Sequence, residues 1–363
     1  NKVEEKGNKG RMDYTLLLIV VLLVVIGLVI LYSTSAYNGQ VKFHDSFYYL
    51  KKQAFATVLG IVLMLFVAGM DYHIWQRLAV FGYLAAVALS VAVMLFGREI
   101  NGSKRWLALG PFSFQPSEFA KVALILLLAD LVTKNVKTIG KMWTLCRIMF
   151  WILPIVGLVG ASNLSTAIII LGIGVILIFV ASPKYAQFAL MGIAGACFMG
   201  IFLALESYRL ERLAIWRNPE KYEKGYQTLQ GLYAIGSGGV FGVGIGNSVQ
   251  KLGFVPEAQN DMIFSIICEE LGLAGAGIIV FLFLLLIWRF FLIASGSRDL
   301  FGALIATGAM AHMMIQVILN IAVVTNTIPN TGITLPFISY GGTSVMFLLI
   351  EMGLVLSVSQ VVD

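Results

Sequence analysis

The chain passes from a polar loop into an apolar helix in the stretch Val255-Pro-Glu-Ala-Gln-Asn-Asp-Met-Ile-Phe-Ser-Ile-Ile-Cys-Glu-Glu-Leu-Gly272, which carries four carboxylates. An ionisable side chain inside a membrane segment costs about 2.5 to 3.5 kcal/mol on insertion scales, so it is a functional candidate by default. Because proline suits the first turn of a helix, we expect the helix to begin near Pro256. Glu257 and Asp261 would then lie four residues apart on one helix face, at the mouth of a membrane helix. A capped helix entrance with solvated acids is the alternative that this spacing leaves open.

The composition indicates an integral membrane protein. Of the 363 residues, 59% are hydrophobic and 12% are charged, whereas a soluble domain carries about 25% charged residues. The length suits one polytopic domain over residues 1–363. The net charge of +6 comes from basic residues scattered among loops, which argues against nucleic acid and favours anionic lipid or phosphate as the partner. The three cysteines lie far apart and indicate neither disulfides nor a zinc site.

Ten apolar runs are long enough to span a membrane, so the sequence predicts an all-α fold with ten transmembrane helices. The first run is long for the apolar core of a signal peptide, although the small residues Ser33, Ser35 and Ala36 leave cleavage as an alternative. The approximate ranges of the ten runs are 14–32, 53–70, 78–96, 118–133, 148–161, 164–181, 187–205, 262–288, 300–324 and 345–360.

An even number of spans places both termini on one side of the membrane. Lys and Arg divide equally between the two sets of loops, so the basic N-terminal segment decides the orientation, and we expect the termini in the cytoplasm. Three segments on the other side are rich in glycine, proline and polar residues: 97–117, 206–260 and 325–344. Irregular backbone near a membrane persists where protein or a water-filled cavity satisfies its polar groups. We expect these segments to line one outward cavity, with three separate surface loops as the alternative.

Glu118 and Lys121 lie on neighbouring turns of one face of the fourth predicted helix. Lys121 then has two interpretations: it neutralises Glu118 inside the span, or it offers a cation to an anionic headgroup together with Lys104 and Arg105. The glycine-rich segment 236–247 lacks the spacing and the strand–helix context of a dinucleotide or phosphate-binding loop. It is either a close-packed loop or a nest of backbone N–H groups beside a pyrophosphate.

Six motifs together resemble the FtsW/RodA/SpoVE family, the SEDS proteins, from the first helix to the last. Gly246-Asn-Ser-Val-Gln-Lys251 is similar to the division and sporulation branch of that family. The six motifs are Asn101-Gly-Ser-Lys-Arg-Trp106, Phe114-Gln-Pro-Ser-Glu-Phe-Ala-Lys121, Gly225-Tyr-Gln-Thr-Leu-Gln230, Ala234-Ile-Gly-Ser-Gly-Gly239, Pro256-Glu-Ala-Gln-Asn-Asp261 and Leu335-Pro-Phe-Ile-Ser-Tyr-Gly-Gly342.

The resemblance implies a peptidoglycan glycosyltransferase of the bacterial cell membrane. Such an enzyme polymerises lipid II on the outer leaflet, in division, sporulation or control of cell shape. One essential carboxylate acting on an activated donor fits a direct, inverting displacement. The enzyme works with a class B penicillin-binding transpeptidase and other divisome or cell-wall proteins, at the division septum. A lipid II flippase and a non-enzymatic scaffold for the transpeptidase are the alternatives.

The resemblance also implies roles for individual residues. Asp261 matches the family's catalytic aspartate and is the expected general base. Glu257 and Glu118 are supporting residues that either tune this base or hold a divalent cation, Mg or Mn, although no metal site is indicated by spacing. Cations would hold the departing pyrophosphate. The expected substrate-binding residues, besides Lys121, are Arg105, Lys104, Gln230, Ser237, Lys251 and Ser339.

Two departures from the family pattern limit this transfer. Asn260-Asp261-Met262 stands where the family usually has Thr-Asp-Phe. Ser162-Asn163-Leu164-Ser165-Thr166 stands where it tends to have Pro-Asp-Leu-Gly-Thr. We therefore assign no acidic role to Asn163.

Overall fold

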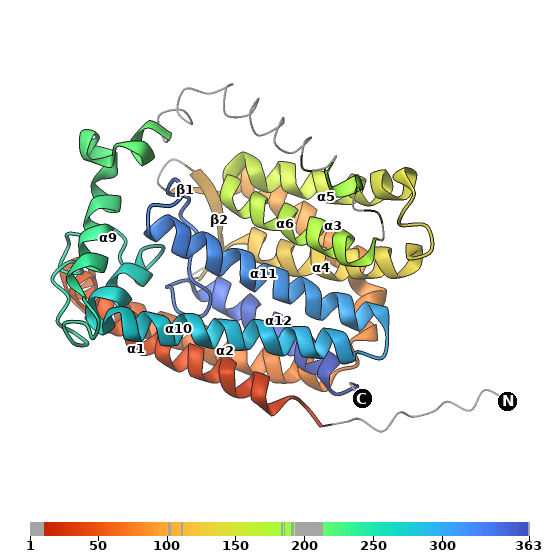
Figure 1. The fold of residues 1–363 in the computed structure, drawn as a ribbon, viewed down its shortest axis with the longest axis horizontal. Helices are drawn as coiled ribbons and strands as arrows, with labels where there is room; N and C mark the ends of the chain where they lie inside the picture. The colour runs from red at the N-terminus through yellow and green to blue at the C-terminus, as the bar shows by residue number, and fades with distance from the viewer. Residues whose placement is uncertain are drawn as a thin grey trace.

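The part of the chain that the computed structural model describes contains nine long helices. They lie side by side (Figure 1). The described residues are 11–100, 103–109, 112–182 and 213–361, together with 184, 186–189 and 192. The nine helices are α1 (Tyr14–Phe43), α2 (Tyr48–Gly69), α3 (His73–Phe96), α4 (Pro116–Asn135), α5 (Met142–Ser162), α6 (Leu164–Ala181), α10 (Ile263–Gly296), α11 (Leu300–Val324) and α12 (Gly342–Ser359).

The predicted all-α membrane fold is confirmed. Each of nine predicted spans corresponds to one of these helices, and the remaining span, 187–205, lies mostly outside the described residues. Eight of the described helices are long and apolar enough to cross a membrane. The predicted loop 206–260 contains a further helix, α9 (Tyr226–Ser237), and two short 3-10 helices, η1 (Pro219–Lys221) and η2 (Glu223–Gly225). The segment 97–117 folds into a small antiparallel sheet of β1 (Arg98–Ile100), β2 (Ser103–Leu109) and β3 (Phe112–Phe114).

Helix α4 forms the centre of the bundle. It packs against α3, α5, α6, α11 and α12, and most of its side chains are buried. Its four charged residues, Glu118, Lys121, Asp130 and Lys134, keep its composition from resembling that of a lipid-facing span. Proline at the first position, Pro116, starts the helix directly after β3. The central helix therefore carries charge into the protein interior, and it pairs that charge within itself, as Glu118–Lys121 and Asp130–Lys134.

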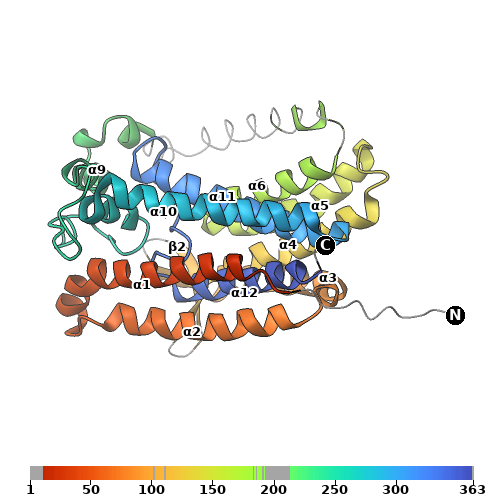
Figure 2. The ribbon, with the colours of Figure 1, turned by 60° about the horizontal axis from the view of Figure 1, so that its bottom comes forward.

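The start of α1 and the end of α12 meet at one end of the bundle. The backbone N–H of Asp13 donates to Ser359 Oγ at 3.1 Å, and the Asp13 carboxylate pairs with the guanidinium of Arg289 in α10. Helix α9 and the loop that follows it lie at the opposite end (Figures 1 and 2), which we call the α9 end. In Figure 2, α10 and α11 lie above α1, α2 and α12, and they pack against this second group through α1 and α12. Because the start of α1 and the end of α12 are joined, both ends of the described chain lie at the same end of the bundle, opposite the α9 end. An even number of membrane spans predicts this arrangement.

Helix α10 is interrupted at Gly272, where the backbone has φ +66° and ψ −169°. The glycine-rich loop after α9 is hydrogen-bonded to the backbone of α10 on both sides of this break. Loop N–H groups donate to carbonyls before Gly272, and N–H groups after Gly272 donate to loop carbonyls. The four backbone hydrogen bonds run from Val243 N to Glu269 O, Gly244 N to Glu270 O, Leu273 N to Gly239 O and Ala274 N to Val240 O, at 2.9 to 3.0 Å. The loop backbone is therefore fixed to α10, and at residues 243 and 244 its N–H groups serve the fold rather than forming a nest for a pyrophosphate.

The expected helix start at Pro256 is wrong, because α10 begins at Ile263. Residues 256–262 form turns, and Glu257 has a left-handed φ of +53°. Other segments take the carbonyls that a helix would need: Tyr340 N donates to Gln259 O, and Asn320 Nδ2 donates to Asp261 O, both at 2.9 Å. Glu257 and Asp261 therefore do not share a helix face.

The loop–break pairing predicts unequal effects of two glycine substitutions. Gly242 and Gly246 both have left-handed φ values, +77° and +88°, but a Cβ at Gly242 would lie 2.2 Å from Glu270 O, whereas one at Gly246 would meet no atom within 4 Å. The left-handed backbone alone costs about 1 to 2 kcal/mol for alanine. Gly242→Ala should therefore lower the melting temperature in detergent well beyond Gly246→Ala. Equal shifts would show that the loop does not pack as described.

Candidate active site

Asp261 lies at the α9 end, in the turn immediately before α10, and its side chain is half-buried. Gln227 of α9 donates from Nε2 to Asp261 Oδ1 at 3.4 Å and to Pro256 O at 3.2 Å. Asn330, beyond α11, donates in turn to Gln227 Oε1 at 3.3 Å. The predicted outward segments 206–260 and 325–344 therefore do meet, and they meet at this carboxylate.

Burial raises the pKa of Asp261 to about 6, and the negative charge of Glu257 adds to the increase. Hydrogen bonds from the backbone N–H groups of Asp261 and Met262 and from the Gln227 amide act in the opposite direction. The result is a carboxylate that is ionised at neutral pH yet binds a proton more tightly than a solvated aspartate. These are the properties that a general base requires.

Glu257 and Glu118, the two supporting carboxylates, have separate surroundings. Glu257 is exposed and accepts a hydrogen bond from Asn260 Nδ2. Glu118 is buried, and both of its oxygens are in use: Oε1 lies 3.1 Å from Lys121 Nζ, and Oε2 accepts from Ser344 Oγ at 2.9 Å. This arrangement does not favour a divalent cation on Glu118. Among the described residues, no three His, Cys, Asp or Glu side chains gather as a metal site.

Lys121 is only 2% exposed. Besides its ion pair with Glu118, its ammonium donates to Gln316 Oε1 of α11 at 3.4 Å. This geometry favours the first of the two interpretations, in which the pair neutralises itself inside the bundle.

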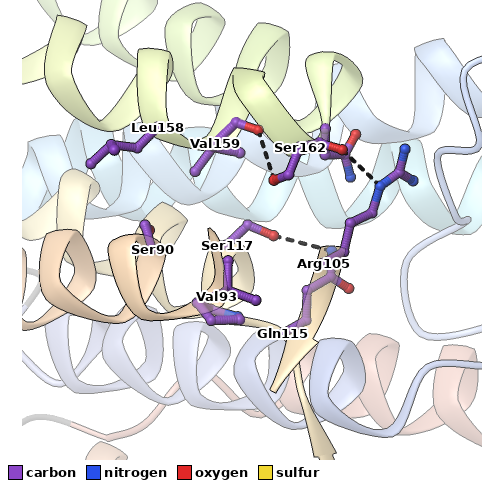
Figure 3. Close-up of a pocket in the computed structure, with 10 residues that line it drawn as sticks. Ser90, Val93, Arg105, Gln115, Ser117, Leu158, Val159 and Ser162 are labelled. Atoms are coloured by element: carbon purple, nitrogen blue, oxygen red, sulfur yellow. Dashed lines mark hydrogen bonds between the residues drawn. The ribbon is translucent and has the colours of Figure 1, made fainter. Parts of the chain in front are cut away.

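Arg105 lies on β2 and its side chain is half-buried. Its Nε donates to Ser162 O at the end of α5, at 3.0 Å, beside a small pocket whose lining also includes Ser117 and Asn163 (Figure 3). Asn163 caps α6, accepting from Thr166 N at 3.2 Å, which explains why an amide serves at this position. Lys104 next to Arg105 is exposed. The basic pair thus lies where β2 meets the junction of α5 and α6.

Lys251 is buried rather than available to a substrate. Its ammonium lies 2.6 Å from Glu270 Oε1 and 3.0 Å from Ser33 Oγ of α1. Glu269 holds the same loop by accepting from Val249 N at 3.0 Å and from the hydroxyl of Ser248. Two of the four carboxylates in the opening stretch therefore fix the loop 238–251 against the break in α10.

The remaining predicted substrate-binding residues are divided between a surface and the interior. Gln230 and Ser237 lie on α9, half-buried and exposed respectively, and Ser237 Oγ donates to Ala234 O at 3.0 Å. Ser339 is buried and accepts from Leu335 N at 2.8 Å, within its own turn. In the described part of the chain, none of the three is hydrogen-bonded to Asp261.

Three residues around Asp261 were missed by the sequence analysis: Gln227, Asn330 and Asn320. Gln227 lies within the motif Gly225–Gln230, one helical turn before Gln230, which we predicted as a substrate-binding residue. Asn320 had a clearer signal, because an amide within the apolar helix α11 is costly unless it is bonded.

Replacing Asp261 should reveal the cost of its burial. The folded-state pKa of about 6 lies above the ordinary aspartate pKa of 3.8, so the charged aspartate opposes folding increasingly as the pH rises from about 4 to about 6. Asp261→Asn should therefore gain thermal stability relative to wild type across this range and keep the gain above it. Asp45 gives the opposite control, because a hydrogen bond from Lys51 lowers its pKa. Asp45→Asn should not gain stability relative to wild type with rising pH. If the stability difference between Asp261→Asn and wild type does not change with pH, the burial of Asp261 is contradicted.

The Glu118–Lys121 pair predicts a non-additive pair of substitutions. Lys121→Met leaves a buried carboxylate without its partner, which typically costs about 3 to 5 kcal/mol. Glu118→Gln combined with Lys121→Met should be more stable than Lys121→Met alone, as measured by thermal unfolding. Equal losses of activity in both variants, with unchanged stability, would instead assign Lys121 to the substrate.

The chain is similar to known proteins over nearly its whole length. Stage V sporulation protein E of Bacillus subtilis is 39% identical over 365 residues, covering 97% of this chain and 98% of the relative. Probable peptidoglycan glycosyltransferase FtsW of Trichlorobacter lovleyi is 35% identical over 96% of this chain and 93% of its own length.

Solved structures agree with these relatives. A chain from a study described as "Structural coordination of polymerization and crosslinking by a peptidoglycan synthase complex" superposes with a TM-score of 0.83, at 30% identity, over 96% of this chain and 97% of that one. Rod shape determining protein RodA of Thermus thermophilus gives 0.72 at 28% identity, over 96% of each chain. A family model described as "Cell cycle protein" matches residues 14–363. The chain therefore belongs to the FtsW/RodA/SpoVE family of cell cycle proteins.

Proposed function

We propose that this chain is a peptidoglycan glycosyltransferase that joins lipid II disaccharide units on the outer leaflet and releases undecaprenyl pyrophosphate. The observation that carries the proposal is Asp261: a half-buried carboxylate of raised pKa, held where segments before α10 and after α11 converge. The relatives named as peptidoglycan glycosyltransferases and the similarity to a peptidoglycan synthase structure support it.

In this proposal Asp261 accepts the proton of the 4-hydroxyl group of the acceptor sugar. The oxygen attacks the anomeric carbon of the donor, the bond from that carbon to the pyrophosphate oxygen breaks, and its electron pair leaves with the pyrophosphate. One carboxylate acting on an activated donor gives a single displacement, and therefore inversion. Because its pKa is about 6, Asp261 is unprotonated at neutral pH and still basic enough to assist.

The departing pyrophosphate needs cationic contacts. Lys121 and Lys251 are held in buried ion pairs. Arg105 and Lys104 are less buried, and we propose these two as the contacts. Lys121 would then act indirectly, by stabilising α4 and its neighbours. A divalent cation, Mg or Mn, stays a prediction, with the exposed Glu257 as the carboxylate that could reach it.

We also propose that the protein works at the division septum or in sporulation, beside a class B penicillin-binding transpeptidase. The similarity to a chain from a complex that coordinates polymerisation and crosslinking supports this partner. The interrupted helix α10 is a feature that transporters share, so the lipid II flippase is the alternative that the following experiment must test.

Asp261→Asn keeps shape and hydrogen-bonding capacity but cannot accept the proton. It should lower the rate of glycan polymerisation from lipid II, in the reconstituted complex, roughly a hundredfold to ten-thousandfold. Glu257→Gln should cost less, because Glu257 acts on Asp261 through its charge. Translocation of lipid II is measured in parallel in liposomes. Near wild-type polymerisation combined with lost translocation would favour the flippase, and no effect on either would favour a scaffold.

A further inference from the structure

The segment 331–340, between α11 and α12, runs through the protein interior without regular secondary structure. Ile333, Leu335 and Ile338 are 5%, 1% and 0% exposed. Buried backbone groups of this kind need partners. At its ends, Thr331 O accepts from Ser165 Oγ at 2.7 Å, and Tyr340 N donates to Gln259 O at 2.9 Å.

Helix α11 supplies the partners for the middle of this segment. His312, Gln316 and Asn320 follow one another at intervals of four residues, so they lie on one face of the helix. All three are at most 2% exposed. A polar stripe of this length inside an apolar helix is costly unless each member is bonded to protein.

Asn320 bonds two segments at once. Its Nδ2 donates to Asp261 O at 2.9 Å and to Ile333 O at 2.7 Å. A carbonyl oxygen can only accept, so the amide nitrogen must face both carbonyls and its two hydrogens are both used. The turn that carries Asp261 and the buried segment are thereby fixed to the same atom of α11.

Gln316 supports this contact from one turn away. Its Nε2 donates to Thr334 O at 3.0 Å, which directs its Oε1 toward Lys121 Nζ and toward His312 Nε2, at 3.4 and 2.8 Å. His312 Nε2 is therefore a donor. Its Nδ1 lies 2.8 Å from the buried carboxylate of Glu351 in α12. The stripe thus links the Glu118–Lys121 pair and α12 to the segment beside Asp261.

We propose that Asn320 is a positioning residue for glycosyl transfer, which sets the place of the Asp261 carboxylate by fixing its backbone to the segment 331–340. The inference rests on the proposed function, in which Asp261 is the base. Asn320 is hydrogen-bonded to the backbone carbonyl of Asp261 rather than to its carboxylate. Its removal leaves two buried carbonyls without this donor and releases the turn before α10.

Asn320→Leu tests the proposal, because leucine has the same number and branching of side-chain heavy atoms as asparagine and no donor. The rate of polymerisation from lipid II at saturation should fall roughly ten- to a hundredfold, the effect expected of a misplacement of about 1 Å, with KM little changed. The acid limb of the pH–rate profile should also move to lower pH, because a released Asp261 becomes better solvated. Glu257 is the titratable group whose charge acts on Asp261 in this structure, and it is kept in every variant.

Asn135→Leu is the matched control. Asn135 Nδ2 also donates to a backbone carbonyl, that of Leu131 at 2.8 Å, at the end of α4 remote from the active site. This variant should keep both the saturating rate and the acid limb. Should Asn320→Leu not fold, Asn320→Ser retains one hydroxyl donor and should show a smaller shift of the acid limb in the same direction.

The outcomes separate the two proposals. If Asn320 only stabilises the fold, Asn320→Leu lowers the rate by the same factor at every pH, in line with the fraction of folded protein. The acid limb then stays in place, and this result would overturn the positioning role. Asp261→Asn is measured in the same series. If it is inactive while Asn320→Leu behaves as wild type, only the positioning role fails. If Asp261→Asn is active, the proposed function fails and the positioning role fails with it.

Discussion

Backbone groups that leave helical structure inside the bundle must find hydrogen-bond partners, and the α9 end of this protein is organised by that constraint. The break at Gly272 is filled by the loop after α9, whose N–H and C=O groups replace those that the helix loses. The segment 331–340 is satisfied by side chains from α11 and α6 and by the turn before α10. Asp261 lies between these two irregular segments, so its position depends on both.

The four carboxylates of residues 255–272 illustrate how one constraint yields different roles. Glu269 and Glu270 are buried and hold the loop, through the residues Ser248, Val249 and Lys251. Glu257 is exposed, and Asp261 lies at the boundary between water and protein. Only at such a boundary is a carboxylate both desolvated enough to bind a proton firmly and open enough to exchange it.

Much of the fold could be predicted from the sequence, because hydropathy records which segments leave water. Nine helices were located correctly, although α2, α3 and α5 begin five or six residues before their apolar runs and α1 continues eleven residues beyond its own. These extra turns contain polar residues, which lower the hydropathy without ending the helix. The start of α10 could not be predicted, because Tyr340 and Asn320, distant in sequence, take the carbonyls of its expected first turn. Lys251 resembled a substrate contact for the same reason: its partners Glu270 and Ser33 become neighbours only in the folded chain. The roles of Asp261 and its companions came from motif resemblance, and the structure adds their surroundings.

The contact between Asp13 and Ser359 has a consequence for the way this protein is joined to others. Because the start of α1 and the end of α12 are tied together and to Arg289, any domain fused before the first helix emerges beside any domain fused after the last. Two fluorescent proteins attached in this way would lie within energy-transfer distance. A single linker between the two points would close the chain into a ring without crossing the bundle.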